Sequence, residues 1–278
     1  MSEQALDRLA VLARIAEYEA AGIFDRDVEN DPPTVPLDYT KVDYLGERLS
    51  TRIGTRIANR VATAHYEKMI KRGVFRLGEV HGIENVASIP GGALFTCNHF
   101  SALDNYAVWR SVRHLFGKRR LYKIIREGNY TSFPGLYGYL FRHCNTLPLA
   151  SSPHGLRRVM DCTVTLLSRG ERVLIYPEQA MWWNYKKPRP CKAGAYYTAV
   201  RAGVPVVPFF ITMTDSGDLG EDGFPIPIHT VHILPPLYPD PSLSRREAAE
   251  KLAEENYAAW CRTYEEFYGI PVRYGDRL

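Results

Sequence analysis

Apolar residues in the first part of the chain recur at every third or fourth position between residues 5 and 20, the spacing of one helix face. A proline-rich break over residues 31–36 ends this stretch. Helical spacing resumes over residues 42–72. We therefore expect residues 1–72 to form an N-terminal helical arm and residues 73–278 to form the main domain.

Beyond the arm, short apolar runs alternate with segments of helical spacing. A final helix is predicted from Ser244, where Ser244 and Glu247 have the spacing of a capping box, to about residue 268. Alternation of this kind indicates a single α/β domain with a central mixed β-sheet flanked by helices. The predicted strands cover residues 74–80, 93–97, 121–125, 146–149, 173–176, 204–212 and 231–234.

Size and composition agree with one large domain, because 278 residues with 45% hydrophobic content can bury an extensive core. The 35 basic and 31 acidic residues are spread along the chain without like-charge blocks, so nucleic acid is not an expected partner. The five cysteines are widely spaced and form no CxxC pair. This pattern argues against a disulfide framework or a zinc site, and it favours a reducing cytoplasm.

No apolar stretch is long enough for a spanning helix. Residues 1–22 carry Asp7, Arg8 and Glu17 where a signal peptide needs an uncharged core. We expect a cytoplasmic protein that is soluble or held peripherally on the inner face of the cell membrane.

The second predicted helix is the candidate for membrane contact. Apolar and arginine residues recur in it side by side every four positions, a pattern that suits an anionic lipid surface. The alternative is a helix packed on the domain with a charged outer edge. The residues concerned are Leu45, Leu49, Ile53, Ile57 and Val61, with Arg48, Arg52, Arg56 and Arg60.

Candidate chemistry lies in residues 92–104, which read as a buried strand, a short turn and a helix beginning at Ser101. His99 then follows the carboxyl end of a strand, where active sites of α/β sheets collect, and Asp104 lies within reach of its imidazole. An imidazole can take a proton from a hydroxyl while a carboxylate fixes its tautomer. The helix start could also favour developing negative charge. The alternative for Ser101 and Asp104 is simple helix capping.

The pattern Asn98-His99-x-Ser101-x-x-Asp104 resembles the first motif of the glycerolipid acyltransferases, the PlsC-like superfamily that acts on lysophosphatidic acid or glycerol 3-phosphate. The resemblance extends over roughly residues 74–213 and implies a histidine general base oriented by an aspartate. It also implies acyl-CoA or an acyl-carrier protein as donor, with no metal or other cofactor. Further features in the same order are Gly170, Tyr176-Pro177-Glu178, Lys192-Ala-Gly194-Ala195 and Gly203-Val-Pro205-Val-Val-Pro208.

Two motifs depart from the family pattern. The third reads Phe-Pro-Glu-Gly-Thr-Arg in the family, whereas residues 176–181 have Gln179 in place of the glycine and lack the arginine. The second motif would end in an arginine near residues 149–152, and none is there. In the family these arginines help to hold the phosphate of the acceptor. Either nearby cations replace them here, or the acceptor carries no phosphate and packs against Trp182 and Trp183.

The resemblance gives a set of expected site residues. His99 and Asp104 are the predicted catalytic dyad. The residues predicted to bind substrate are Asn98, Ser101, Glu178, Gln179, Lys186, Lys187, Arg189, Lys192 and Gly194.

The expected function is transfer of a fatty acyl group from acyl-CoA or an acyl-carrier protein to the hydroxyl of a lyso-lipid, first of all 1-acyl-glycerol-3-phosphate. A phosphate-free lyso-glycolipid or aminolipid is the alternative acceptor. A thioesterase or esterase would use the same dyad on water, and a lipid-binding relative would lack turnover. A serine hydrolase is disfavoured because the chain has no Gly-x-Ser-x-Gly.

Overall fold

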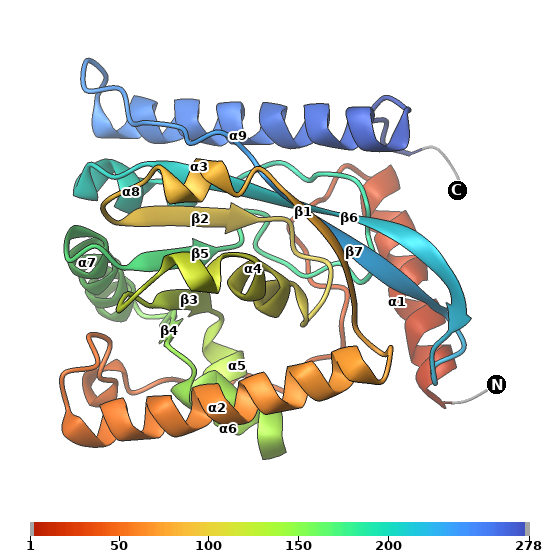
Figure 1. Ribbon diagram of the computed structural model, residues 1–278, viewed down its shortest axis with the longest axis horizontal. Coiled ribbons are helices and arrows are strands. Elements are labelled where there is room, and N and C mark those ends of the chain that lie inside the picture. Colours follow the sequence, from red (N-terminus) through yellow and green to blue (C-terminus); the bar gives the residue numbers. More distant parts are fainter. Residues whose placement is uncertain (1–2, 276–278) are drawn as a thin grey trace.

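A seven-stranded mixed sheet forms the centre of the molecule in a computed structural model, which describes residues 3–275 (Figure 1). The strand order is β1-β7-β6-β2-β5-β3-β4. Neighbouring strands run parallel except for the antiparallel pair β6 and β7. The strands are β1 (Arg76–His81), β2 (Ala93–Cys97), β3 (Leu121–Ile125), β4 (Thr146–Pro148), β5 (Arg172–Ile175), β6 (Val206–Leu219) and β7 (Pro225–Ile233).

Helices cover both faces of this sheet. Apolar side chains of α4 pack on one face, and those of α7, α8 and α9 pack on the other. The helices are α1 (Glu3–Ala20), α2 (Leu49–Lys71), α3 (Glu84–Ala87), α4 (Asp104–Val112), α5 (Glu127–Thr131), α6 (Gly135–His143), α7 (Pro153–Ser168), α8 (Tyr197–Ala202) and α9 (Arg245–Tyr268). Short 3-10 turns lie at Tyr39–Lys41, Arg113–Leu115 and Ala193–Ala195.

The predicted α/β class and mixed sheet are confirmed, and β2 and β3 have the predicted bounds. The structure also confirms the capping box of α9, in which Ser244 and Glu247 each accept the other's backbone N–H. The prediction for β6 is too short. Its second half is polar and exposed, and it forms a strand by pairing with β7 rather than by entering the core.

Two helices begin later than predicted. The Asp43 carboxylate accepts the N–H groups of Glu47 and Arg48 and so holds the residues before α2, which begins at Leu49. At α4, the Ser101 hydroxyl accepts the Leu103 N–H in a turn, and the helix begins at Asp104. The predicted helix start at Ser101 is therefore wrong, because side-chain hydrogen bonds to the backbone hold the residues before each helix in turns.

The two helices of the N-terminal arm lie in different places (Figure 1). Helix α1 packs through Val11 and Ile15 against Trp182 and Tyr185, in the segment that follows β5. Helix α2 instead contacts α6, where Ala58 meets Leu140 and Cys144. The first helix of the arm thus supports the loop that follows β5, and the division at residue 72 stays a prediction.

Candidate active site

The carboxyl ends of β2 and β5 bring the candidate residues together. These strands are parallel neighbours, with Thr96 paired to Ile175. His99 lies two residues beyond the end of β2, and Tyr176 and Glu178 follow the end of β5. The same edge of the sheet therefore carries the first and third motif, as expected for an α/β active site.

His99 and Asp104 form the predicted pair. The imidazole Nδ1 lies 2.7 Å from Asp104 Oδ2, and the Asp104 side chain is fully buried. The His99 side chain keeps 21% of its surface exposed. Because a carboxylate can only accept, Nδ1 carries the proton, and the exposed ring offers Nε2 as a base to an incoming hydroxyl.

Tyr176 supports both members of this pair. Its hydroxyl donates to Asp104 Oδ1 at 2.6 Å, and its ring stacks on the His99 ring with 3.9 Å between centroids. Burial, with the Asp104 charge as the next cause, raises the pKa of Tyr176 well above its usual value, so the hydroxyl stays a donor. Both carboxylate oxygens of Asp104 are thereby fixed in place.

The backbone of His99 is held by a buried ion pair. Glu178 Oε2 accepts the His99 N–H at 2.9 Å and also pairs with Arg189 Nη2 at 2.7 Å. Arg189 in turn donates to the His99 carbonyl at 3.2 Å. Glu178 and Arg189 expose only 2% and 1% of their side chains. We predicted that Glu178 and Arg189 bind substrate. In the structure they bond to each other and to the His99 backbone, so they act as positioning residues.

Asn98 and Ser101 also bond internally. The Asn98 amide accepts the Ile211 N–H at 2.8 Å and donates to the Ile211 carbonyl at 3.0 Å, which ties the end of β2 to β6. The Ser101 N–H lies 3.4 Å from Asp104 Oδ2. This N–H therefore faces the dyad carboxylate, and α4 has no side-chain cap among the described residues.

The predicted cations after Glu178 lie mostly against the N-terminal arm. Lys187 pairs with Glu19 at 2.6 Å, and Lys192 pairs with Asp25 at 2.7 Å. Lys186 is exposed and its amine stands 5.8 Å from the centre of the Tyr268 ring. Within residues 3–275, none of these three amines forms a hydrogen bond with His99 or Asp104.

Gln179 and Gly194 are exposed. Gln179 has a φ of +70°, a left-handed conformation that favours glycine, which explains why the family motif has glycine at this position. Trp182 is fully buried and donates to the Arg26 carbonyl at 2.8 Å. It therefore serves as core between the arm and the loop after β5, while Trp183 is partly buried beside Phe224.

Sequence reasoning did not place Tyr176 in the site. The signal was present, because the family motif begins with phenylalanine and tyrosine adds a hydroxyl at that position. For a metal, the described residues contain no cluster of three or more histidine, cysteine, aspartate or glutamate side chains that could hold one.

Comparison with known proteins shows which family these residues resemble. Residues 78–212, which include the dyad, Tyr176 and Arg189, match the family model described as Acyltransferase. Over these residues the chain is similar to the acyltransferase family. The dyad and the later motifs thus lie within the matched residues.

Two relatives define the extent of the likeness. The chain is 30% identical over 150 residues to the chloroplastic 1-acyl-sn-glycerol-3-phosphate acyltransferase BAT2 of Brassica napus, a match that covers 52% of this chain and 39% of that protein. It therefore spans about two fifths of that relative's length. The crystal structure of the 1-acyl-sn-glycerophosphate acyltransferase PlsC from Thermotoga maritima shares the fold, with a TM-score of 0.53, 20% identity, and 96% and 97% of the two chains covered.

Proposed function

We propose that this protein transfers a fatty acyl group from acyl-CoA or acyl-carrier protein to the hydroxyl of a lyso-lipid. The observation that carries the proposal is the His99 ring, which is partly exposed and held by Asp104 at 2.7 Å, inside a matched acyltransferase domain. His99 Nε2 takes the proton of the acceptor hydroxyl, whose oxygen attacks the thioester carbonyl. The C–S bond then breaks, and the thiolate leaves with a proton from the imidazolium.

The dyad supplies only part of the rate. Positioned general-base catalysis contributes on the order of 100- to 10,000-fold. Holding donor and acceptor in line must supply much of the rest. The stacked Tyr176 ring and the braced His99 peptide serve this end, because they restrict the imidazole to one orientation.

For the acceptor, we propose 1-acyl-glycerol-3-phosphate first, in line with the printed names of both relatives. A phosphate-free lyso-lipid is the second candidate. A specific observation favours it: Lys187, Arg189 and Lys192 are paired with Glu19, Glu178 and Asp25. Of the four predicted substrate-binding cations, only Lys186 has no carboxylate partner among residues 3–275.

A panel experiment tests both parts of the proposal. The full-length protein is incubated with labelled acyl-CoA or acyl-carrier protein and, separately, with lysophosphatidic acid, lyso-glycolipid and lyso-aminolipid. Mass spectrometry should detect acylated lipid and no excess of free fatty acid. Release of fatty acid at the same rate with and without acceptor would instead show a thioesterase. Labelled lipid bound without turnover would leave only a binding protein.

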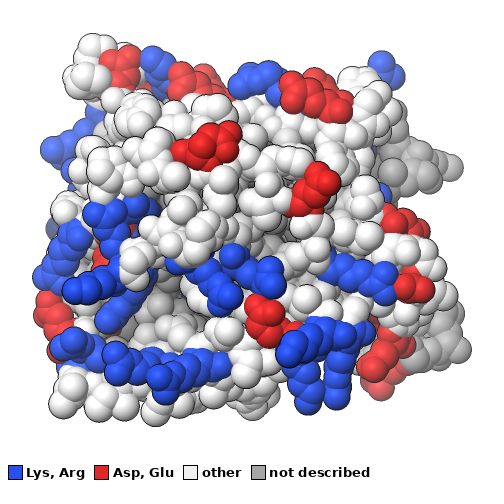
Figure 2. Space-filling view, in the orientation of Figure 1, with Lys and Arg blue, Asp and Glu red and all other residues white. Residues whose placement is uncertain are grey.

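We also propose that α2 contacts an anionic membrane surface. Three apolar side chains on it are largely exposed, with Leu49 at 69%, Ile53 at 53% and Ile57 at 50%. Lys and Arg side chains gather along the same helix at the lower edge of the molecule, whereas α9 at the upper edge carries both signs (Figure 2). No helix among the described residues is long and apolar enough to cross a bilayer. The pattern is that of a helix lying in the lipid interface.

Vesicle flotation tests this contact. Wild-type protein should float with phosphatidylglycerol vesicles more than with phosphatidylcholine vesicles, and the I53S/I57S variant should float less with both. An unchanged flotation of the variant would place the contact elsewhere.

A further inference from the structure

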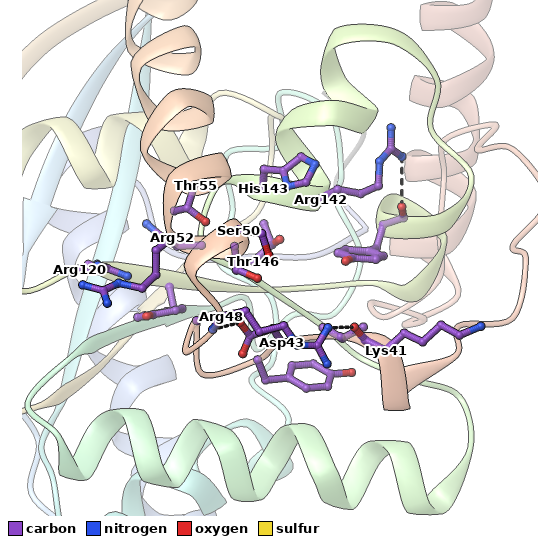
Figure 3. A pocket seen from close by; sticks show the side chains of 17 residues that line it. Lys41, Asp43, Arg48, Ser50, Arg52, Thr55, Arg120, Arg142, His143 and Thr146 are labelled. Carbon is purple, nitrogen blue, oxygen red and sulfur yellow. Dashed lines mark hydrogen bonds between the residues drawn. The ribbon is translucent and has the colours of Figure 1, made fainter.

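A cavity of about 230 Å³ opens at the amino end of the parallel strands, away from the dyad. It lies between the start of α2, the starts of β3 and β4, and the end of α6 (Figure 3). His99 follows the carboxyl end of β2, whereas Arg120 immediately precedes β3, and both strands run parallel to β5. The five residues of β2 alone separate the two ends of the sheet by roughly 15 Å.

The lining of this cavity is strongly basic. Lys41, Arg48, Arg52, Arg120 and Arg142 all line it, together with His143. Hydroxyl groups of Ser50, Thr51, Thr55 and Thr146 add neutral donors. Asp43 is the single acidic side chain among the described lining residues, and its carboxylate already accepts two backbone N–H groups at the start of α2.

Several of these cations have no carboxylate partner in the described part of the chain. The Arg48 guanidinium donates to the Lys41 carbonyl, and that of Arg142 donates to two backbone carbonyls. Arg52 and Arg120 form no ion pair with a described residue. Their side chains lie on the same side of the cavity (Figure 3). Like charges placed together without a counter-charge raise the free energy of the site, and a bound anion relieves it.

We infer that this cavity binds a phosphate group, at a site separate from the acyl-transfer site. A phosphate monoester carries a charge of about −1.5 to −2 near pH 7 and three strong acceptor oxygens. Arginine matches it with paired N–H donors, and the hydroxyls around the cavity bond the remaining oxygen lone pairs. A free phosphate compound and the headgroup of an anionic phospholipid share this chemistry. The exposed apolar residues Leu49 and Ile53 beside the cavity make a lipid headgroup a natural source.

Calorimetric titration of the full-length protein with inorganic phosphate tests the site. Wild type should bind phosphate saturably, and the R52Q/R120Q variant should bind at least about tenfold more weakly, a change of about 1.4 kcal/mol. The control variant R56Q/R60Q loses the same charge from α2 at positions that do not line the cavity, and its affinity should match wild type. His99→Ala should also bind phosphate like wild type.

Two outcomes would overturn the inference. One is the absence of saturable phosphate binding by wild type, and the other is equal weakening in R52Q/R120Q and R56Q/R60Q. A second arm identifies the source, using phosphatidylcholine vesicles with and without phosphatidic acid. If the site takes a lipid headgroup, R52Q/R120Q loses more of the preference for phosphatidic acid than R56Q/R60Q, which removes the same charge from the α2 membrane contact alone. If it takes a free compound, R52Q/R120Q loses no more of that preference than R56Q/R60Q, and R52Q/R120Q alone fails to bind phosphate.

Discussion

The two ends of the parallel strands treat charge in opposite ways. At the carboxyl end, Asp104 and Glu178 are buried and each is bonded to a specific partner. At the amino end, Arg52 and Arg120 line an open cavity without a carboxylate partner in the described chain. Pairing with internal partners fixes the orientation of the His99 imidazole, which general-base catalysis needs. Arginines without such partners can bind an anion from outside the protein. The carboxyl end of the strands therefore orients the catalytic imidazole, whereas the amino end attracts an anion.

The largest predicted effect on the free energy of unfolding comes from removing the charge of Glu178. Glu178→Gln leaves the Arg189 guanidinium, 1% exposed, without its counter-charge and should lower the free energy of unfolding by about 3–5 kcal/mol. Arg52→Gln at the other end should change it by no more than about 0.5 kcal/mol, because Arg52 is exposed. Urea denaturation measures both. Equal effects of the two substitutions would remove the distinction between the ends.

Lowering the pH tests the carboxyl end of the strands through a buried histidine, His229. His229 packs on Phe100, one residue beyond His99, and burial lowers its pKa from 6.5 to about 4. The unfolded chain therefore takes up this proton first as pH falls. The stabilisation from the neutral imidazole is complete above pH 6.5 and is lost as pH falls towards 4, at a cost of about 3 kcal/mol.

The variant H229F isolates this titration. Its free energy of unfolding should fall less than that of wild type between pH 7 and pH 4, by about 3 kcal/mol. His232, whose pKa burial also lowers to about 4, keeps titrating in both proteins and serves as an internal control. Parallel pH profiles for wild type and H229F would contradict the burial argument.

A smaller effect is expected at Tyr176. Tyr176→Phe keeps the ring on His99 and removes the hydroxyl that bonds Asp104 at 2.6 Å. We expect kcat to fall roughly tenfold with KM unchanged, since a charged hydrogen bond that orients the dyad is lost. Tyr176→Leu, which loses the ring as well, should fall further. If Tyr176→Phe turns over like wild type, the hydroxyl has no positioning role.

The smallest predicted effect concerns Gln179, at a φ of +70°. Gln179→Gly should raise the free energy of unfolding by about 0.5–1 kcal/mol, because glycine adopts the left-handed region without the strain of a Cβ. Gln179→Ala is the matched control and should bring no gain. Thermal unfolding distinguishes the two, and a destabilised glycine variant would show that the Gln179 side chain contributes more than its backbone strain costs.

The sequence predicted the strands and the dyad because their signals are local. Apolar runs gave β2 and β3 their bounds, and the spacing of His99 and Asp104 within one turn brought both to the same place. The partners of Glu178 and the basic cavity are not local. Arg120 and Arg52 come from segments far apart in the chain, and only the fold brings them to one cavity. For the same reason, spacing alone could not show that Lys187 and Lys192 pair with the N-terminal arm.

The most direct measurement of the central claim is the rate of acyl transfer by His99→Ala with acyl-CoA and the best acceptor of the lyso-lipid panel. His99 is partly exposed, so the variant should fold, as circular dichroism can verify. The account predicts that kcat/KM falls by on the order of 100- to 10,000-fold. A folded His99→Ala protein that transfers the acyl group at the wild-type rate would contradict it.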